Sequence, residues 1–531
     1  MRFSLNPASI GGIACCLLVA GLPTIARSAP DVLPPPANHC VTPEDPVAVG
    51  TAQWNGWGRD LENSRYQPEP AIRATDVPKL RLKWAYGFAG AKQNGQPTIV
   101  DGRLFVASSS GRVYSLDAKT GCTYWTYDAA AATRTAVILG ELGTTKTLFG
   151  LKKLKLKKNA HIEVEKPPSA VFFGDDAGAV YALDARTGRL LWKTQADGHP
   201  LARISASPAL YRNLLYVPVA SSEDASAASP QYACCTFRGS VVALDIATGR
   251  IVWQTYMSAE VPKPYRKNDS GTQLFGPAGM AIDTTPTIDT ARELLYVGTG
   301  AAHADAPQPN ADAIVALSLA DGRERWVRKL DPPNSGSGFG GAPILRNLSL
   351  TRQILLAAHR SGSVYGLDPD ADGAILWQSK LNVGGTDGVQ SGPAADHRSV
   401  YAAFAAVDAP SAPATGGLLA LDIATGKLRW ATPSSVPACT GGALQCARSE
   451  SRAVTVIPGI AFAGSMDGHL RAYSSIDGKN LWDVDTATSY ATRNGLSANG
   501  GPLDRDGPTI VSGMLYVDSG DALLAFSIDG K

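Results

Sequence analysis

The chain has 531 residues, 49 basic and 47 acidic side chains, and a hydrophobic fraction of 44%. This charge balance gives no electrostatic reason to expect nucleic acid as a partner, and the apolar fraction is too high for a disordered protein. After the first thirty residues no apolar run approaches the ~20 residues of a membrane-spanning helix. The 54 Gly and 36 Pro residues favour a β-rich globular protein interrupted by many turns.

The N-terminal residues predict a secretory signal peptide over 1–28. Arg2 gives a basic start, Ile10–Leu22 forms the apolar core, and Ala-Arg-Ser at 26–28 offers small residues for cleavage. Acylation of a cysteine within the core, as in a lipoprotein, is an alternative, although the preceding Gly-Ile-Ala fits a lipobox poorly. We expect a periplasmic or secreted protein, with no membrane span after signal removal and an extended linker over 29–50.

Removal of the signal leaves an even number of cysteines, which in an exported chain suggests disulfides. Cys439 and Cys446 are close enough in sequence to close a small loop, and Cys40 and Cys122 remain as a further pair. The other two, at 234 and 235, are adjacent, so they can bond only through a tight ring. A disulfide and two buried thiols are both open at this point. No CxxCH occurs, which predicts no c-type haem in this chain.

One phrase recurs along the chain: Gly-x-Val-x-x-Leu-Asp-x-x-Thr-Gly-x-x-x-Trp. Its Trp residues are 51 to 73 positions apart, a period typical of propellers and repeat arrays rather than of separate domains. The clearest copies are GRVYSLDAKTGCTYW (111–125), GAVYALDARTGRLLW (178–192) and GSVVALDIATGRIVW (239–253), and looser copies end at Trp326, Trp377, Trp430 and Trp482.

Each copy predicts two antiparallel strands. The first alternates faces, Asp-x-x-Thr-Gly supplies a tight turn, and the second strand ends at the Trp. An apolar strand precedes the copies, as in LFVA (104–107), and a Pro-led strand precedes that one, as in PTI (97–99). Each unit therefore has about four strands, the content of one propeller blade.

The two ends of the repeat region predict how the array closes. The chain stops at DALLAFSIDGK (521–531), the first half of the phrase, whereas LRLKW (80–84) is its second half. Joined, they make an eighth copy, which would close the ring and remove an exposed sheet edge. We predict an all-β, eight-bladed β-propeller over 51–531 with four-stranded blades, whose N- and C-terminal strands share one blade.

A Lys-rich insertion, predicted over 141–168, interrupts the second blade. Six lysines lie within Lys146–Lys158. A solvated excursion or charged edge hairpin would explain them, since Lys protects sheet edges from pairing. A docking patch for an acidic cytochrome or for the envelope surface is the alternative.

The repeats are similar to the eight-bladed propellers of quinoprotein alcohol dehydrogenases, which hold pyrroloquinoline quinone (PQQ) and usually Ca²⁺. The opening motif WNGWGRD (54–60) with NSRY (63–66) resembles that of the family. The likeness extends over nearly all of 40–531. The stretches that resemble the polyvinyl-alcohol dehydrogenases of this family are RTAV (134–137), CCTFRGSVVALD (234–245), YVGTG (296–300), DGHLRAY (467–473) and GPTIVSGMLYVDSG (507–520).

The resemblance implies that three arginines and a serine bind the cofactor. Arg134 and Arg203 would hold PQQ carboxylates, a task suited to a bidentate guanidinium. Arg360 would lie near the quinone oxygens and stabilise charge on the reduced quinone. Ser205 takes a position where a hydroxyl bonds the cofactor.

Four further residues receive roles from the same resemblance. Cys234 and Cys235 would form a vicinal disulfide stacked on one face of PQQ. Glu223 matches the acidic Ca²⁺ ligand, and a hard oxygen donor suits that ion. Asn494 matches the late loop that reaches the cofactor rim.

The chain also departs from the family pattern. Asp283 stands where the family commonly has the second stacking Trp, Ala301 replaces the metal-binding Asn, and Ser391 replaces a further pocket Trp. The loop 331–343, expected to carry the general base, is shortened, with Ser335 near the expected acid. Asp283 and Asp387 are the candidates for a substitute base. Eight Trp residues end blade phrases and two belong to the opening motif, so none is expected in the pocket.

We therefore expect an exported PQQ-dependent enzyme that oxidises an alcohol, secondary or polymeric, and passes electrons to a separate cytochrome c or other acceptor. The departures favour an alternative from another class. In it, a propeller that no longer catalyses serves as a binding or assembly scaffold in the envelope.

Overall fold

The fold comes from a computed structural model of the chain. Every element described here belongs to one compact unit, residues 36–531, and within the described ranges no helix is long and apolar enough to cross a membrane. Five features singled out in the sequence lie outside the described residues: the Lys-rich segment 146–158, Cys439, Cys446, Ser335 and Asp387. The structure describes residues 38–41, 53–143, 168–303, 308–330, 338–380, 391–404, 416–433, 452–503 and 505–531.

The recurring Asp-x-x-Thr-Gly sequence folds as the predicted tight turn. In the second copy, Asp184 Oδ1 accepts hydrogen bonds from the Thr187 N–H and from Thr187 Oγ1, both at 2.8 Å. Gly188 follows with φ of +71°, a left-handed conformation that glycine adopts at little cost. The turn therefore fixes the register of the two strands that carry the rest of the phrase.

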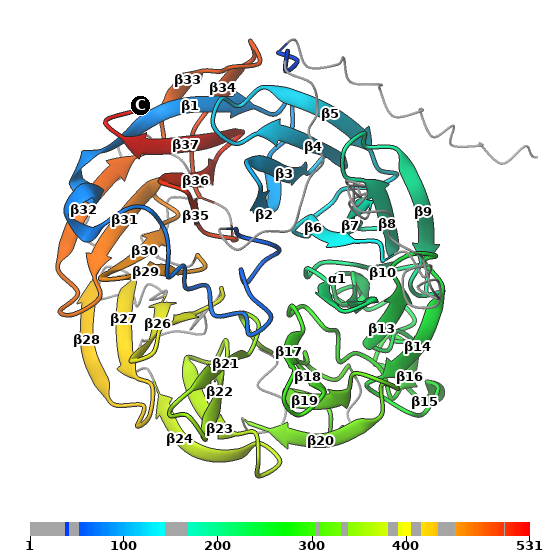
Figure 1. The fold of residues 1–531 in the computed structure, drawn as a ribbon. Helices are drawn as coiled ribbons and strands as arrows, with labels where there is room; N and C mark the ends of the chain where they lie inside the picture. Colours follow the sequence, from blue (N-terminus) through cyan, green and yellow to red (C-terminus); the bar gives the residue numbers. More distant parts are fainter. Residues whose placement is uncertain are drawn as a thin grey trace, which may run out of the picture. The chain divides into compact units, whose positions relative to one another are not determined.

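The first four blades are antiparallel sheets, each ordered from an inner strand near the centre of the ring to an outer strand at the rim (Figure 1). The third carries one extra short strand, β10 (Ala202–Arg203), on β12. Their strands are β2 (Gln93–Val100), β3 (Arg103–Ser108), β4 (Arg112–Asp117), β5 (Thr123–Asp128); β6 (Ile138–Glu141), β7 (Ser169–Gly174), β8 (Ala179–Asp184), β9 (Leu190–Gln195); β11 (Ala209–Tyr211), β12 (Leu214–Ser221), β13 (Ser240–Asp245), β14 (Ile251–Tyr256); and β17 (Thr287–Asp289), β18 (Leu294–Gly298), β19 (Ala313–Ser318), β20 (Glu324–Lys329).

The last four blades complete a ring of eight within the described part of the chain. In the eighth, β1 pairs with β37 in antiparallel register from Leu80 opposite Ile528 to Gly87 opposite Ala522, which confirms the predicted closure by both ends of the repeat. Their strands are β21 (Ile344–Asn347), β22 (Gln353–Ala358), β23 (Ser363–Asp368), β24 (Ala374–Lys380); β25 (Ala394–Ala395), β26 (Ser399–Phe404), β27 (Gly417–Asp422), β28 (Leu428–Pro433); β29 (Thr455–Ile457), β30 (Ile460–Gly464), β31 (His469–Ser474), β32 (Asn480–Asp485); and β35 (Thr509–Val511), β36 (Met514–Ser519), β37 (Ala522–Ile528), β1 (Leu80–Gly87).

The recurrent Trp joins each blade to the next. Trp125 Nε1 donates to the Ala185 carbonyl at 3.0 Å, and its ring packs against Gly188, where an added Cβ would lie 2.7 Å from ring atoms. Trp192 repeats the contact on the following blade, with Nε1 donating to Ile246 O at 2.9 Å. The Gly of the turn is thus required twice, for its φ and for the close approach of the indole.

A segment from Trp54 to Gln67 crosses the centre of the ring (Figure 1) and bonds to the inner strands of several blades. Asn55 exchanges hydrogen bonds with Leu139 in β6, and Asn63 Nδ2 donates to Thr287 Oγ1 in β17 at 2.9 Å. Gln67 Nε2 donates to the Ile510 carbonyl in β35 at 3.1 Å. The opening motif therefore ties together blades that lie on different sides of the ring.

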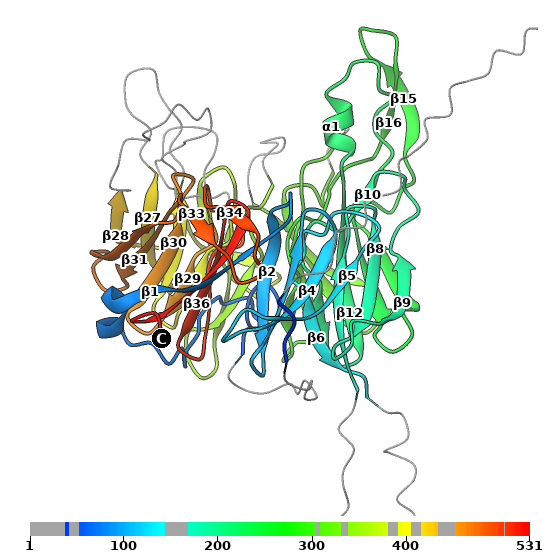
Figure 2. The ribbon, with the colours of Figure 1, turned by 90° about the horizontal axis from the view of Figure 1, so that it is seen from above.

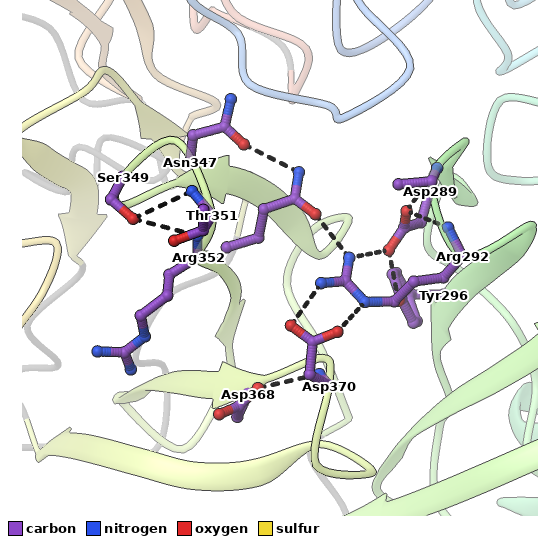
Figure 3. A network of polar contacts seen from close by, with 11 residues as sticks. Asp289, Arg292, Tyr296, Asn347, Ser349, Thr351, Arg352, Asp368 and Asp370 are labelled. Atoms are coloured by element: carbon purple, nitrogen blue, oxygen red, sulfur yellow. Dashed lines mark hydrogen bonds and ion pairs between the residues drawn. The ribbon is translucent and has the colours of Figure 1, made fainter.

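A polar network joins blades four and five (Figure 3). Arg292 donates to Asp289 Oδ2 in its own blade at 2.7 Å, and to both carboxylate oxygens of Asp370 in the next blade at 2.7 and 2.8 Å. Tyr296 O–H donates to the same Asp289 oxygen at 2.8 Å. The hydrogen bonds to Asp370 raise the pKa of Arg292, so this contact stays charged.

The remaining elements stand outside the blades. The hairpin β15 (Lys263–Lys267) and β16 (Gln273–Gly276) and the short helix α1 (Glu223–Ala227) project from one face of the ring (Figure 2). A second hairpin pairs β33 (Ser489–Ala491) with β34 (Ser497–Asn499), and the 3-10 helix η1 (Ala74–Lys79) precedes β1. The predicted Cys40–Cys122 disulfide is confirmed, with an S–S distance of 2.02 Å, and fastens residues 38–41 to blade one.

Candidate functional site

A pocket lies at the N-terminal ends of the inner strands. In successive blades, the few residues just before the inner strand contribute side chains of different chemistry to this pocket. The residues that line it are Trp57, Arg134, Ser205, Ala206, Ser207, Asp283, Thr284, Thr285, Gly340, Gly341, Ala342, Arg360, Ser391, Gly392, Arg505 and Asp506. The structure thus brings together five residues singled out in the sequence: Arg134, Ser205, Asp283, Arg360 and Ser391.

Three guanidinium groups and two carboxylates share this pocket. Arg134 Nε donates to both oxygens of Asp176, at 2.7 and 3.0 Å, and the Arg134 side chain is half exposed. Burial lowers the pKa of Arg360; the carboxylate of Asp283 opposes this shift and the neighbouring Arg505 adds to it. The pocket therefore presents positive charge from several directions, the arrangement that a polyanionic planar ligand needs.

Asp283 and Ser205 form a direct pair. The Ser205 hydroxyl donates to Asp283 Oδ1 across two neighbouring blades. Asp283 Oδ2 carries no hydrogen bond within the described residues. The position expected for a stacking Trp is thus a carboxylate held by a hydroxyl.

Trp57 overturns the expectation that no Trp reaches the pocket. It comes from the segment that crosses the centre of the ring, and it packs against Gly392 so closely that an added Cβ there would overlap the indole. Arg65 covers the ring from another side, with its guanidinium carbon 4.7 Å from the centroid. The ring that the blades lack is thus supplied by the opening motif.

Arg203 is not among the residues lining this pocket. It lies in β10 opposite Ala220 of β12, and its Nε is buried without a hydrogen-bond partner in the described part of the chain. A buried guanidinium N–H without a partner is a donor that a ligand could satisfy. Its role in cofactor binding stays a prediction.

Cys234 and Cys235 form a disulfide, but they too lie apart from the residues lining this pocket. Cys235 is fully buried. Phe275 in β16 donates its N–H to the Cys234 carbonyl at 2.7 Å, which fastens the cysteine loop to the projecting hairpin. Stacking of this disulfide on PQQ stays a prediction.

Glu223, expected to bind Ca²⁺, holds the cysteine loop instead. Its Oε1 accepts from the Thr236 N–H at 2.8 Å and from the Tyr232 hydroxyl at 3.2 Å, and its Oε2 accepts from the Phe237 N–H at 2.9 Å. The residue is 1% exposed. The two backbone donors point their partial positive charge at the carboxylate, where a cation would have to approach.

The residues present do not fit a Ca²⁺ site at Glu223. Ca²⁺ takes 6–8 oxygen ligands. No group of three or more His, Cys, Asp and Glu side chains gathers anywhere in the ranges that the structure describes. Ala301, at the position of the expected Asn ligand, offers only its carbonyl, which accepts the Met280 N–H at 2.7 Å.

Asn494 fastens a strand end rather than lining the pocket. Its Nδ2 donates to the Gly87 carbonyl at 2.8 Å and its Oδ1 accepts the Gly87 N–H at 3.0 Å. Both ends of the amide are therefore engaged at the end of β1. Contact of this residue with the cofactor rim stays a prediction.

Trp57, Arg505 and Asp506 are pocket residues that the sequence interpretation missed. A signal for two of them exists. Arg505 and Asp506 lie three and two positions before Pro508, as Asp283 and Thr284 lie three and two positions before Pro286, and all four line the pocket. Nothing comparable marks Trp57, because its place depends on the path of a segment across the ring.

Comparison with known proteins agrees with this geometry. Residues 54–330 match the family model described as glucose/ethanol/alcohol dehydrogenase, β-propeller domain, and residues 360–507 match that of the outer membrane protein assembly factor BamB. A polyvinylalcohol dehydrogenase of Pseudomonas sp. is 40% identical, over 92% of this chain and 79% of its own. That of Sphingopyxis sp. (strain 113P3) is 39% identical, over 93% and 79%.

Solved structures support the fold. The quinohemoprotein alcohol dehydrogenase of Comamonas testosteroni superimposes with a TM-score of 0.66 at 19% identity, over 91% of this chain and 81% of that one. A europium-containing methanol dehydrogenase gives a TM-score of 0.61 at 17% identity, over 90% and 98%. The chain belongs to the family of PQQ-dependent alcohol dehydrogenases.

Proposed function

We propose that this protein is an exported PQQ-dependent dehydrogenase that oxidises secondary alcohol groups, including those of a polymer, and passes the electrons to a separate cytochrome c. The observation that carries the proposal is the convergence of Arg134, Arg360 and Arg505 with the Trp57 ring in one pocket. PQQ is a planar anion with three carboxylates, so the guanidinium groups match its charge and the indole offers a flat face to its ring system.

When bound, PQQ supplies a quinone that accepts two electrons from the alcohol. The chain's own part is to hold that anion, to orient the alcohol and to take its hydroxyl proton. Asp283 is the group suited to the proton, because Oδ1 is fixed by Ser205 while Oδ2 is open. Arg360 lies beside it in the same pocket, and a carboxylate oxygen is a suitable general base for an alcohol proton.

The substrate class follows from the relatives. Two proteins about 40% identical over more than nine-tenths of this chain are polyvinylalcohol dehydrogenases, which supports a secondary alcohol on a chain molecule as the substrate here. No step of this account passes through Ca²⁺, because the surroundings of Glu223 do not fit that ion.

The test is dye-linked turnover by the purified protein after loading with PQQ. We expect reduction of an artificial acceptor to depend on both PQQ and a secondary alcohol, with Asp283→Asn lowering kcat by about 10²-fold or more. If PQQ-loaded protein reduced no acceptor with either small or polymeric alcohols, the proposal that this protein is an enzyme would be wrong. That result would favour a non-catalytic scaffold, in line with the match of residues 360–507 to the family model of an assembly factor.

A further inference from the structure

A second concavity, of about 810 Å³, lies between the outer strands of blades three and four, beside the base of the β15–β16 hairpin. Its walls come from the end of β14, the hairpin base, residues 308–310 and Glu324 in β20. It shares no lining residue with the central pocket. Nothing in the chemistry described so far uses it.

One wall is apolar and rigid. Tyr256, Met257 and Pro277 line it. The Tyr256 ring is held in place, because the Arg238 guanidinium carbon lies 3.9 Å from its centroid and its hydroxyl donates to Asp197 Oδ2 at 3.1 Å. Tyr265, on the hairpin, is 43% exposed and offers a second aromatic face. Such faces bind the CH and CH₂ groups of a flexible ligand.

The opposite side is rich in hydrogen-bond acceptors. Asn310 is 7% exposed, and its Nδ2 donates to Glu324 Oε2 at 2.8 Å, so Asn310 Oδ1 and Glu324 Oε1 are the acceptors offered to a ligand. Glu260 adds an exposed carboxylate. No Lys or Arg side chain is among the lining residues. These carboxylates repel anions and accept hydrogen bonds from a ligand that carries hydroxyl groups.

A short stretch of backbone connects the two concavities. Pro277 lines the outer one and Asp283 the central one, and six residues span at most ~20 Å. This stretch is held in place where Met280 N–H donates to Ala301 O and Gly300 N–H donates to Ala281 O. A chain ligand in the outer groove therefore lies within reach of the central pocket.

We propose that this groove binds a neutral acyclic polymer with alternating CH₂ and CHOH groups, so that a polymeric substrate is held while one of its hydroxyls occupies the central pocket. The inference rests on the proposed function. The apolar wall matches the methylene backbone, and the acceptors match the hydroxyls. Tethering raises the local concentration of hydroxyl groups at the pocket, so the groove lowers KM for a polymer and leaves a small alcohol unaffected.

The experiment compares Tyr265→Ala/Glu260→Ala with the native protein. Both side chains are exposed on the groove, so the double variant is expected to fold. Ile476→Ala, an exposed apolar residue (79%) in blade seven, is the control. KM for polyvinyl alcohol should rise about tenfold in the double variant, while KM for a small secondary alcohol and kcat for both substrates stay unchanged. If KM for the polymer in the double variant equalled that of the native protein and of Ile476→Ala, the proposal would be overturned.

Binding without turnover separates this inference from the proposed function. Polyvinyl alcohol is titrated by calorimetry into protein free of PQQ, with dextran in a second arm. Binding of polyvinyl alcohol that the double variant weakens supports the groove even if no alcohol is oxidised. No binding, or binding of dextran alone, would contradict the assignment of an acyclic polyol.

Discussion

The guanidinium of Arg65 lies over the ring of Trp57, and its Nη1 donates to the Trp57 carbonyl at 2.7 Å. Its Nε donates to the Val454 carbonyl at 2.7 Å. Burial lowers the pKa of Arg65 to about 9, so the group is still charged at neutral pH. One fully buried cation thus joins the crossing segment to blade seven, fixes the ring that lines the pocket, and adds positive charge beside it.

Replacement of Arg65 should therefore destabilise the ring of blades. Arg65→Met leaves buried carbonyls without donors, which should cost about 2–4 kcal/mol of unfolding free energy. Urea unfolding followed by Trp fluorescence measures it. Arg186→Ala, an exposed arginine in a blade turn, is the control. A midpoint for Arg65→Met equal to that of the control would contradict this role.

Gly392→Ala should move the indole of Trp57. The added methyl would overlap the nearest atom of the indole, so the ring or the backbone has to shift. We expect a loss of about 1–3 kcal/mol in stability and a matching weakening of PQQ binding. Gly198→Ala is the matched control, since a Cβ there meets nothing within 4 Å and its φ is not positive. Unchanged PQQ affinity in Gly392→Ala would argue against Trp57 as a pocket wall.

Glu223→Ala should loosen the cysteine loop. Without the carboxylate, the N–H groups of Thr236 and Phe237 lose their acceptor, so local opening exposes Cys235 more often. Reduction of the disulfide by dithiothreitol, followed by alkylation and mass spectrometry, should be about tenfold faster. Glu293→Ala, on an exposed ion pair, should leave the rate unchanged.

Glu223 also allows a test of whether PQQ binding requires Ca²⁺. We expect PQQ affinity to be equal with added Ca²⁺ and with EGTA, since the Glu223 oxygens are occupied by protein donors. A Ca²⁺-dependent affinity that disappears in Glu223→Gln would show that the carboxylate is a metal ligand after all.

Stability should depend on pH through His469. Its Nδ1 contacts Asp483 Oδ1 at 2.6 Å, and this hydrogen bond raises the pKa of His469 in the folded protein. The stabilisation is complete below the ordinary His pKa of ~6.5 and is lost as the pH rises through the raised value. The difference in unfolding free energy between native protein and His469→Gln should shrink from pH 6 to pH 9. A difference that grows over this range would contradict the assignment.

The fold was predictable because its information is local and repeated. Asp184, Thr187 and Gly188 sit in one turn, and the Trp that follows is placed by the same phrase in the next blade. The pocket was only partly predictable. Arg134 and Arg360 carry recognisable motifs, but Trp57 reaches the pocket through a crossing segment whose path depends on contacts more than 80 positions away, such as that of Asn55 with Leu139. Asn494 and Glu223 are the opposite case. Both match a family motif, but their side chains form hydrogen bonds with backbone groups.

The most direct test of the assignment of this pocket to PQQ is a titration of the purified protein with PQQ, monitored by quenching of Trp fluorescence and by quinone absorbance. We expect the native protein to bind one PQQ per chain. The affinity of the triple variant Arg134→Ala/Arg360→Ala/Arg505→Ala should be at least 10²-fold lower, since each charge-assisted contact contributes about 1.5–3 kcal/mol. Arg212→Ala, on an exposed ion pair, should bind like the native protein. No saturable binding, or equal affinity in the triple variant, would contradict the assignment of this pocket to PQQ.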